Sequence, residues 1–234
     1  MNEEDYQIEV GYKNMLIQDV NGKASIRIFV ISILFIICMT FLMWAIRLLH
    51  TYIARLGLTL LVIVGYTMVA VVAMILTGQS KKLLPTKEKV GLQILIGVGI
   101  ALGLCLLIGV IPILCGTSLV GSHSDIPMNR MILIAIQDIL FVGVGEEIVF
   151  RGYIQNQFTI WLKSKKWLAP LFAAVMFGLW HLINGSIIQV LFTTIIGCVF
   201  GYATYYIKHC SLLSVIIAHG LYDFSLVLLT CFML

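Results

Sequence analysis

Six ionisable side chains in the C-terminal half of this sequence are of the types that activate water. A carboxylate held in a desolvated pocket has a raised proton affinity and can serve as a general base. An imidazole nearby can orient the water, shuttle its proton or stabilise an oxyanion. The six are Glu146, Glu147, Arg151, His181, His219 and Asp223.

Helical spacing places some of these side chains on common faces. Glu147 and Arg151 are four residues apart, as are His219 and Asp223. Residues at this spacing are neighbours on a helix, so each pair can interact locally. We expect Glu147 to pair with Arg151, which leaves Glu146 as the general base.

Chain length predicts which groups lie at the same depth. The sequence midpoint between Glu146 and His181 falls at the basic cluster 163–166, where an antiparallel helical hairpin would turn. With a rise of about 1.5 Å per residue, both residues lie roughly 20 to 25 Å of helix from that turn. His219 comes only eight residues after Ser211. Tilt or a shortened helix is therefore needed to bring His219 level with them.

The elements that position these groups are predicted to be transmembrane helices. Hydrophobic residues make up 61% of the 234 positions and charged residues only 11%, which a water-soluble surface would not tolerate. Several runs reach the roughly 20 residues that cross a hydrocarbon core, without the period-2 alternation of a barrel. We predict an all-α polytopic transmembrane bundle of about seven spans. They are placed at about 27–47, 56–77, 90–114, 131–162, 167–183, 187–207 and 211–233.

The basic residues predict the orientation of the bundle. These spans put most Lys and Arg on one side and only Arg47, Arg55 and Arg130 on the other. Cytoplasmic loops carry the excess of Lys and Arg, so we expect the N-terminus to be cytoplasmic and the C-terminus outside. The predicted regions are a cytoplasmic segment 1–26, three helices without motifs in 27–130, and a functional membrane core in 131–234.

Acidic residues in the membrane are the strongest physical signal. The first three predicted spans contain none, whereas Asp138, Glu146, Glu147 and Asp223 are the only ones after residue 130 and all fall within spans. Ionisable groups at this depth are costly unless they are paired or face a watery cavity, so they are functional candidates. The alternative is that such groups only bridge helices within the bundle. Asp138 could be a supporting partner of the site or a structural contact.

Other features predict no further activity. The net charge of +4 is spread in short clusters beside the spans, so we expect no nucleic-acid partner and interpret the chain as a lipid-embedded protein. The six cysteines have no paired metal-type spacing. Glycine pairs at four-residue spacing favour helix packing and leave a homodimer open. They are Gly99 with Gly103 and Gly197 with Gly201.

Three short motifs resemble a known family. Residues 145–151 read as EExxxR after a glycine, 177–181 as FxxxH, and 219–223 as HxxxD. Their order and placement on consecutive apolar segments are similar to the CPBP family, which comprises CAAX prenyl proteases and bacteriocin-processing proteins and is also called the Abi domain. The resemblance covers about residues 131 to 228, and the first 130 residues carry no motif.

The resemblance implies an intramembrane glutamate-type endopeptidase that cleaves a membrane-associated peptide or protein. Eukaryotic prenyl proteases have Asn at the last motif position, where this chain has Asp223. Asp223 is either protonated or orients His219, which then donates alone. The implied roles are Glu146 as base, His181 as its partner, His219 with Asp223 as the oxyanion group, and Glu147 with Arg151 as supporting residues.

Alternative functions remain open from the sequence. Two histidines and two carboxylates could ligate catalytic zinc, although the spacing favours a metal-free mechanism without a cofactor. Relatives in the family also include immunity and regulatory proteins, so the chain could bind a bacteriocin-like peptide or a sensor kinase without catalysis. A transporter or proton channel could use the same groups as a relay. The short loops favour a prokaryotic plasma membrane protein.

Overall fold

The computed structural model describes residues 3–46, 48, 51–82, 89–115, 127–183 and 187–232. All regular elements in these ranges are helices, which confirms the predicted all-α membrane bundle. The α-helices are α1 (Glu3–Ile46), α2 (Tyr52–Leu76), α3 (Val90–Leu104), α4 (Ile111–Leu114), α5 (Met128–Gln137), α6 (Gly143–Glu147), α7 (Gln155–Trp161), α8 (Ala169–Trp180), α9 (Ile187–Tyr206) and α10 (Leu212–Phe232).

Wider π-helical turns join several of these helices into longer rods. One such turn links α3 to α4, and two others link α5, α6 and α7 into a single rod that we call the central helix. π-turns insert an extra residue into a helix and occur frequently at functional sites. The π-turns are η2 (Cys105–Val110), η3 (Asp138–Val142) and η4 (Ile148–Ile154); the 3₁₀ turns are η1 (Ser80–Lys82), η5 (Lys163–Leu168) and η6 (His181–Ile183).

Five helical segments within the described ranges are long and apolar enough to cross a membrane. The predicted spans at 131–162 and 167–183 are helical but are not among them. The first is the central helix, which π-turns and charged residues interrupt. The second contains α8, whose 12 residues rise about 18 Å, well short of a 30 Å hydrocarbon core. The five are Ser25–Ile46, Ala54–Leu76, Val90–Leu114, Ile187–Tyr206 and Leu212–Leu229.

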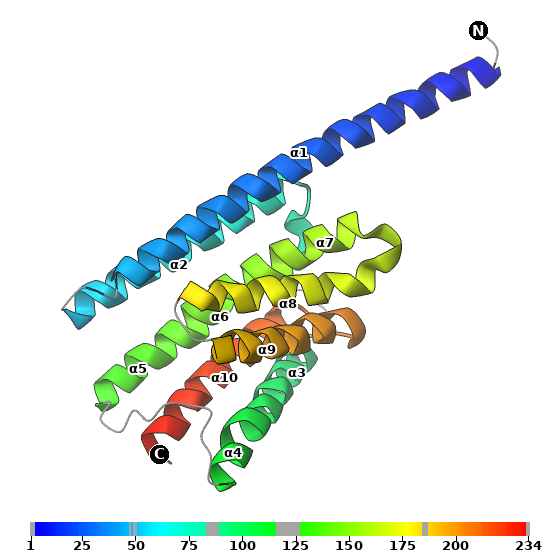
Figure 1. The fold of residues 1–234 in the computed structure, drawn as a ribbon. Helices are drawn as coiled ribbons and strands as arrows, with labels where there is room; N and C mark the ends of the chain where they lie inside the picture. The colour runs from blue at the N-terminus through cyan, green and yellow to red at the C-terminus, as the bar shows by residue number, and fades with distance from the viewer. Residues whose placement is uncertain are drawn as a thin grey trace.

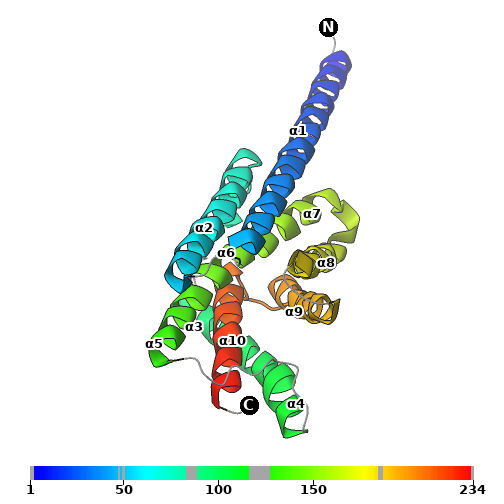
Figure 2. The ribbon, with the colours of Figure 1, turned by 60° about the vertical axis from the view of Figure 1, so that its left-hand side comes forward.

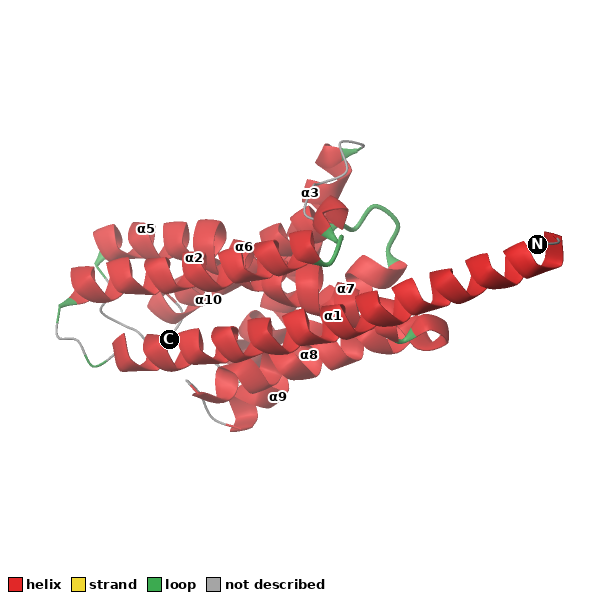
Figure 3. Ribbon diagram, turned by 90° about the horizontal axis from the view of Figure 1, so that it is seen from above, coloured by secondary structure: helices red, strands yellow, loops and turns green. Residues whose placement is uncertain are grey.

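The helices pack around the central helix. The α1–α2 hairpin lies along one side of it, α8 and α9 form a second antiparallel pair, and α3 packs against α10 (Figure 1, Figure 2). The N-terminal end of α1 extends past the rest of the bundle, as Figure 3 shows from above. On α2 the buried residues Ile63, Tyr66, Ala70, Ala73 and Met74 recur at helical spacing, so one face of α2 packs into the core.

Close helix contacts are made possible by glycine. A Cβ atom on Gly220 of α10 would lie 2.6 Å from the Cα atom of Ile139, and one on Gly143 would lie 3.0 Å from the backbone nitrogen of Gly220. Gly145 approaches α2 in the same way, because a Cβ atom there would lie 2.9 Å from Cγ2 of Ile63. Small residues let helix backbones come together in lipid. The central helix is thus held tightly between α2 and α10.

Amide side chains tie three helices together at one end of the bundle. Gln79 Nε2 donates to Gln157 Oε1 at 2.5 Å, and Gln157 Nε2 donates to Ser25 Oγ at 2.8 Å. Asn156 Nδ2 donates to Gln79 Oε1 at 2.8 Å. Gln157 is completely buried, so these bonds satisfy polar groups that water cannot reach. The network places the C-terminal end of α2 beside the C-terminal end of the central helix.

We predict that Gly220→Ala lowers the melting temperature of the purified protein, because the new methyl group meets backbone atoms that cannot rotate away. Overpacking of this kind costs about 1–3 kcal/mol, which exceeds the gain in helix propensity. Gly99→Ala is the matched control, since a Cβ atom there meets nothing within 4 Å. Thermal unfolding in detergent should separate the two variants, and equal melting temperatures would contradict the close contact.

Candidate active site

The two adjacent glutamates lie at the centre of the central helix. Glu146 and Glu147 end α6, with the π-turn η3 before them and η4 directly after. Both are buried, with side-chain exposures of 11% for Glu146 and 0% for Glu147. Consecutive helical residues point about 100° apart, so the two carboxylates enter different surroundings.

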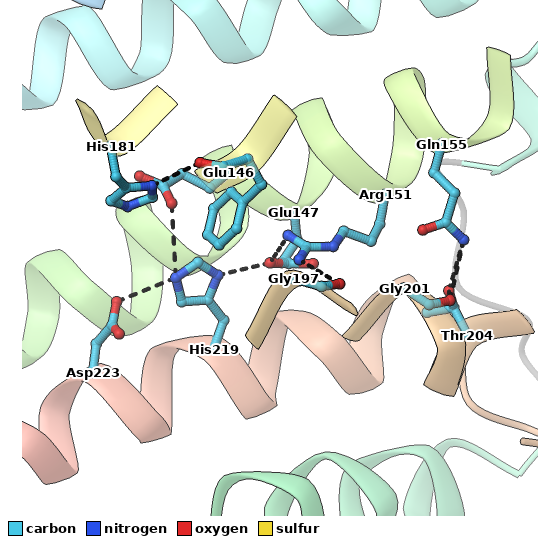
Figure 4. A network of polar contacts seen from close by, with 11 residues as sticks. Glu146, Glu147, Arg151, Gln155, His181, Gly197, Gly201, Thr204, His219 and Asp223 are labelled. Carbon is cyan, nitrogen blue, oxygen red and sulfur yellow. Dashed lines mark hydrogen bonds and ion pairs between the residues drawn. The ribbon is translucent and has the colours of Figure 1, made fainter. Parts of the chain in front are cut away.

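Glu147 contacts a guanidinium and an imidazole that come from different helices. Its Oε1 atom accepts a hydrogen bond from Arg151 Nη1 at 2.7 Å, within the central helix. The same oxygen lies 2.7 Å from His219 Nδ1 on α10. A buried charge of this kind is stable only when it is paired and hydrogen-bonded. Glu147 therefore fixes α10 against the central helix (Figure 4).

The guanidinium of Arg151 is held between two phenylalanine rings. Its Cζ atom lies 4.5 Å from the ring centroid of Phe177 on α8 and 5.3 Å from that of Phe200 on α9. Arg151 Nη2 also donates to the backbone oxygen of Gly197 at 3.2 Å. Cation–π contact and these hydrogen bonds replace the lost hydration of the arginine. Arg151 thereby joins α8 and α9 to the central helix.

His219 faces carboxylates on both sides of its ring. While Nδ1 contacts Glu147, Nε2 lies 3.3 Å from Asp223 Oδ2 and 3.8 Å from Glu146 Oε2. Its ring packs against Phe200 at 5.5 Å and Phe177 at 5.8 Å between centroids. The side chain of Asp223 is 29% exposed, which is more open than the side chains of Glu146, Glu147 and His219. The imidazole is thus fixed in position, with Nε2 on the side of Glu146.

His181 lies at the C-terminal end of α8 with its ring orientation fixed. Its Nδ1 atom lies 2.9 Å from the backbone oxygen of Phe177 and can only donate to that carbonyl. In the neutral ring, Nε2 is then the basic nitrogen. His181 and Glu146 interact electrostatically, and Figure 4 shows the Glu146 carboxylate pointing toward the His181 ring.

The structure brings all six predicted site residues into one cluster. Glu147 pairs with Arg151 as the spacing predicts. His219 lies level with both glutamates despite the predicted mismatch in depth, since its Nδ1 is 2.7 Å from Glu147 and its Nε2 is 3.8 Å from Glu146. Asp138 interacts electrostatically with Asp223, His219 and Glu146, which places it at the edge of the cluster.

Sequence reasoning missed the residues that hold Arg151. Phe200 is completely buried against both Arg151 and His219, and Gly197 supplies the carbonyl acceptor. Neither has a polar or motif signature. The Phe of the FxxxH motif was noted only for its spacing, although Phe177 contacts Arg151, His181 and His219. The only sequence feature that pointed to this region was the four-residue spacing of Gly197 and Gly201, which predicts helix packing. In the structure Gly197 packs against α8 and Gly201 packs against Gln155.

Oxygen atoms in the cluster remain without a hydrogen bond. Glu146 Oε2 and Glu147 Oε2 are both buried and have no hydrogen-bond partner. Within the described part of the chain, no group of three or more His, Cys, Asp and Glu side chains could hold a metal ion. The arrangement has the elements of proton transfer: a carboxylate, an imidazole whose orientation is fixed, and a second imidazole beside carboxylates.

Comparison with protein families supports the resemblance seen in the motifs. Residues 128–225 match the family model described as type II CAAX prenyl endopeptidase Rce1-like. This segment runs from the start of α5 into α10 and contains all six site residues. Searches of curated proteins and of solved structures found no match. Residues 128–225 are therefore similar to the CPBP/CAAX protease family, and α1 to α4 lie outside the matched segment.

We predict that Arg151→Met destabilises the protein strongly, because it leaves the Glu147 carboxylate buried without its closest cation. Breaking a buried pair from one side costs about 3–5 kcal/mol. Adding Glu147→Gln to this variant should recover part of the loss. Chemical unfolding in detergent measures both, with Lys208→Met as the control, since Lys208 is exposed and a surface change stays within about 0.5 kcal/mol. A loss of similar size for Lys208→Met would contradict the assignment.

Proposed function

We propose that the protein is an intramembrane endopeptidase in which Glu146 and His181 activate water to cleave a peptide bond. The observation that carries this proposal is the position of the Glu146 carboxylate beside two imidazoles whose orientations are fixed by other contacts. The similarity of residues 128–225 to the type II CAAX prenyl endopeptidase model supports the same reaction class.

In the proposed mechanism, Glu146 removes a proton from a water molecule whose oxygen attacks the scissile carbonyl carbon. Its Oε2 atom lacks a hydrogen-bond donor, so it can accept one from water. Negative charge then develops on the carbonyl oxygen. The proton held by Glu146 passes to the leaving nitrogen as the carbon–nitrogen bond breaks, which yields a carboxylate and an amine.

His219 is proposed to stabilise the oxyanion. In its doubly protonated form the ring offers Nε2–H and a positive charge on the side of Glu146. Asp223 then orients this ring and need not donate a hydrogen bond itself. Glu147 and Arg151 are too deeply buried to touch a substrate, so they act by holding His219 in place.

We propose that the reaction needs no metal ion. Both ring nitrogens of His219 lie near carboxylates, and Nδ1 of His181 is engaged by a carbonyl. A catalytic zinc site uses three protein ligands around one metal, and these donors are directed at each other instead. The proposed cofactor requirement is therefore none, with zinc as the alternative.

The proposed substrate is a peptide or protein held at the membrane, because the site lies on helices that pack among the membrane-spanning segments. We also propose a cytoplasmic N-terminus. Gln157 donates a hydrogen bond to Ser25 and accepts one from Gln79, which brings three basic segments to one end of the bundle, as cytoplasmic loops require. A prokaryotic plasma membrane, a bacteriocin-type substrate and homodimer formation remain parts of the hypothesis.

We predict that wild-type protein cleaves members of a fluorogenic peptide library in liposomes. Glu146→Gln and His181→Asn should each reduce kcat by about 10²-fold or more, because each removes the proposed general base or its partner. His209→Asn is the matched control, because His209 lies between α9 and α10, away from the cluster. Melting temperatures should first establish that all variants fold.

Full activity of Glu146→Gln would contradict the proposed base. If the folded wild-type protein cleaves nothing, although the same substitutions abolish its cellular function, the alternative of a binding or regulatory protein becomes the better explanation.

We predict that exhaustive chelation leaves kcat unchanged and that metal analysis of active protein finds no stoichiometric zinc. The physical reason is that Nδ1 of His181 and Nδ1 of His219 are each engaged by a protein acceptor. Loss of activity on chelation, with recovery on adding zinc, would overturn the metal-free mechanism but keep the endopeptidase.

A further inference from the structure

Tyr66 on α2 packs beside the cluster from outside the segment that matches the family. It is 1% exposed and lies on the buried face of α2 that contacts the central helix. The matched segment begins only at residue 128, so nothing in the family assignment gives α2 a role.

The ring of Tyr66 lies between the sequence neighbours of the two proposed water-activating residues. On one side, a Cβ atom on Gly145 would lie 3.2 Å from Cε2 of Tyr66, and Gly145 directly precedes Glu146. On the other side, the ring meets Trp180 edge-on, 5.6 Å between centroids, and Trp180 directly precedes His181. The ring therefore separates the backbone of α6 from the end of α8.

The contact with Trp180 continues into the cluster through aromatic rings. Trp180 lies 5.9 Å from Phe150 of the central helix, and Phe150 lies 5.0 Å from Phe177, in each case edge-to-face. Phe177 in turn contacts Arg151 and both histidines. Edge-to-face pairs are directional, so moving one ring changes the best position of the next.

We propose that Tyr66 is a positioning residue whose ring sets the distance between Glu146 and His181, so that α2 is part of the active site. The expected effect on turnover rests on the proposed function. The effect of Tyr66 on the distance between Glu146 and His181 does not depend on that function. The phenol group of Tyr66 also interacts electrostatically with Glu146. Since Tyr66 touches the neighbours of both residues, removing its ring lets the pair shift without removing either group.

The experiment compares Tyr66→Leu with Tyr66→Phe and with Met74→Ala. Met74 is completely buried on the same face of α2 and packs against Gly152 of the central helix. A Cβ atom on Gly152 would lie 3.6 Å from Sδ of Met74. It lies eight residues from Tyr66, so it matches the packing loss without touching the neighbours of Glu146 or His181. We expect Tyr66→Leu to lower kcat by about tenfold to a hundredfold with little change in KM, because misplacement of reacting groups affects turnover.

Tyr66→Phe keeps the ring and should recover most of the lost kcat, while Met74→Ala should lower the melting temperature without the loss in kcat. Equal losses of kcat for Tyr66→Leu and Met74→Ala at equal melting temperature would overturn the inference, since they indicate a general packing effect. Failure of Tyr66→Phe to restore kcat would also overturn the role of the ring.

A spectroscopic measurement separates this inference from the proposed function. In the folded protein, ¹⁵N chemical shifts of the His181 ring, assigned with His181→Asn, should change in Tyr66→Leu and not in Met74→Ala or Tyr66→Phe. This holds whether or not the wild-type protein cleaves any peptide. Unchanged shifts in Tyr66→Leu would reject the positioning role, whereas inactive wild-type protein with changed shifts would reject only the endopeptidase.

Discussion

The buried carboxylate of Glu147 is the constraint on which the arrangement of the other helices depends. With 0% side-chain exposure among membrane-spanning helices, its charge is tolerable only beside cations. Arg151 meets this need at 2.7 Å, and the same oxygen atom of Glu147 also lies 2.7 Å from His219 Nδ1. Because Arg151 then needs Phe177, Phe200 and the carbonyl of Gly197 around it, one charge brings α8, α9 and α10 together on the central helix.

This constraint also separates the tasks of two identical neighbouring residues. Glu147 is held by short hydrogen bonds, whereas Glu146 lies 3.8 Å from His219 and keeps one oxygen without a donor. Leaving a buried acceptor unpaired costs about 1–3 kcal/mol. The strong pairing of Glu147 offsets such a cost, and the π-turns on either side of α6 adjust the direction in which each carboxylate points. Glu147 is held and fixes the site, whereas Glu146 is less restrained and is the residue that we propose as the base.

The sequence allowed the helices and most of the cluster to be predicted, because both depend on local patterns. Apolar runs define helices, and four-residue spacing alone pairs Glu147 with Arg151. The residues around Arg151 could not be predicted, since Phe200 and Gly197 resemble ordinary apolar residues of a membrane helix until the tertiary fold places them against a cation. The short α8 and the π-turns were missed for a related reason, because an apolar run does not report where a helix is interrupted.

The position of α2 follows from the same physics as the cluster. A glutamate pair at the middle of a helix needs a flank free of large side chains, which Gly145 provides toward α2 and Gly143 toward α10. Two closely packed neighbours then fix the central helix from both sides, while the amide network around Gln157 fixes its end. Rigidity on all sides matters because a general base must be held in a productive geometry before water binds. The proposed reactive groups lie on the central helix, α8 and α10. The site nevertheless depends on α2, which carries no motif, because α2 packs against the central helix and holds it in place.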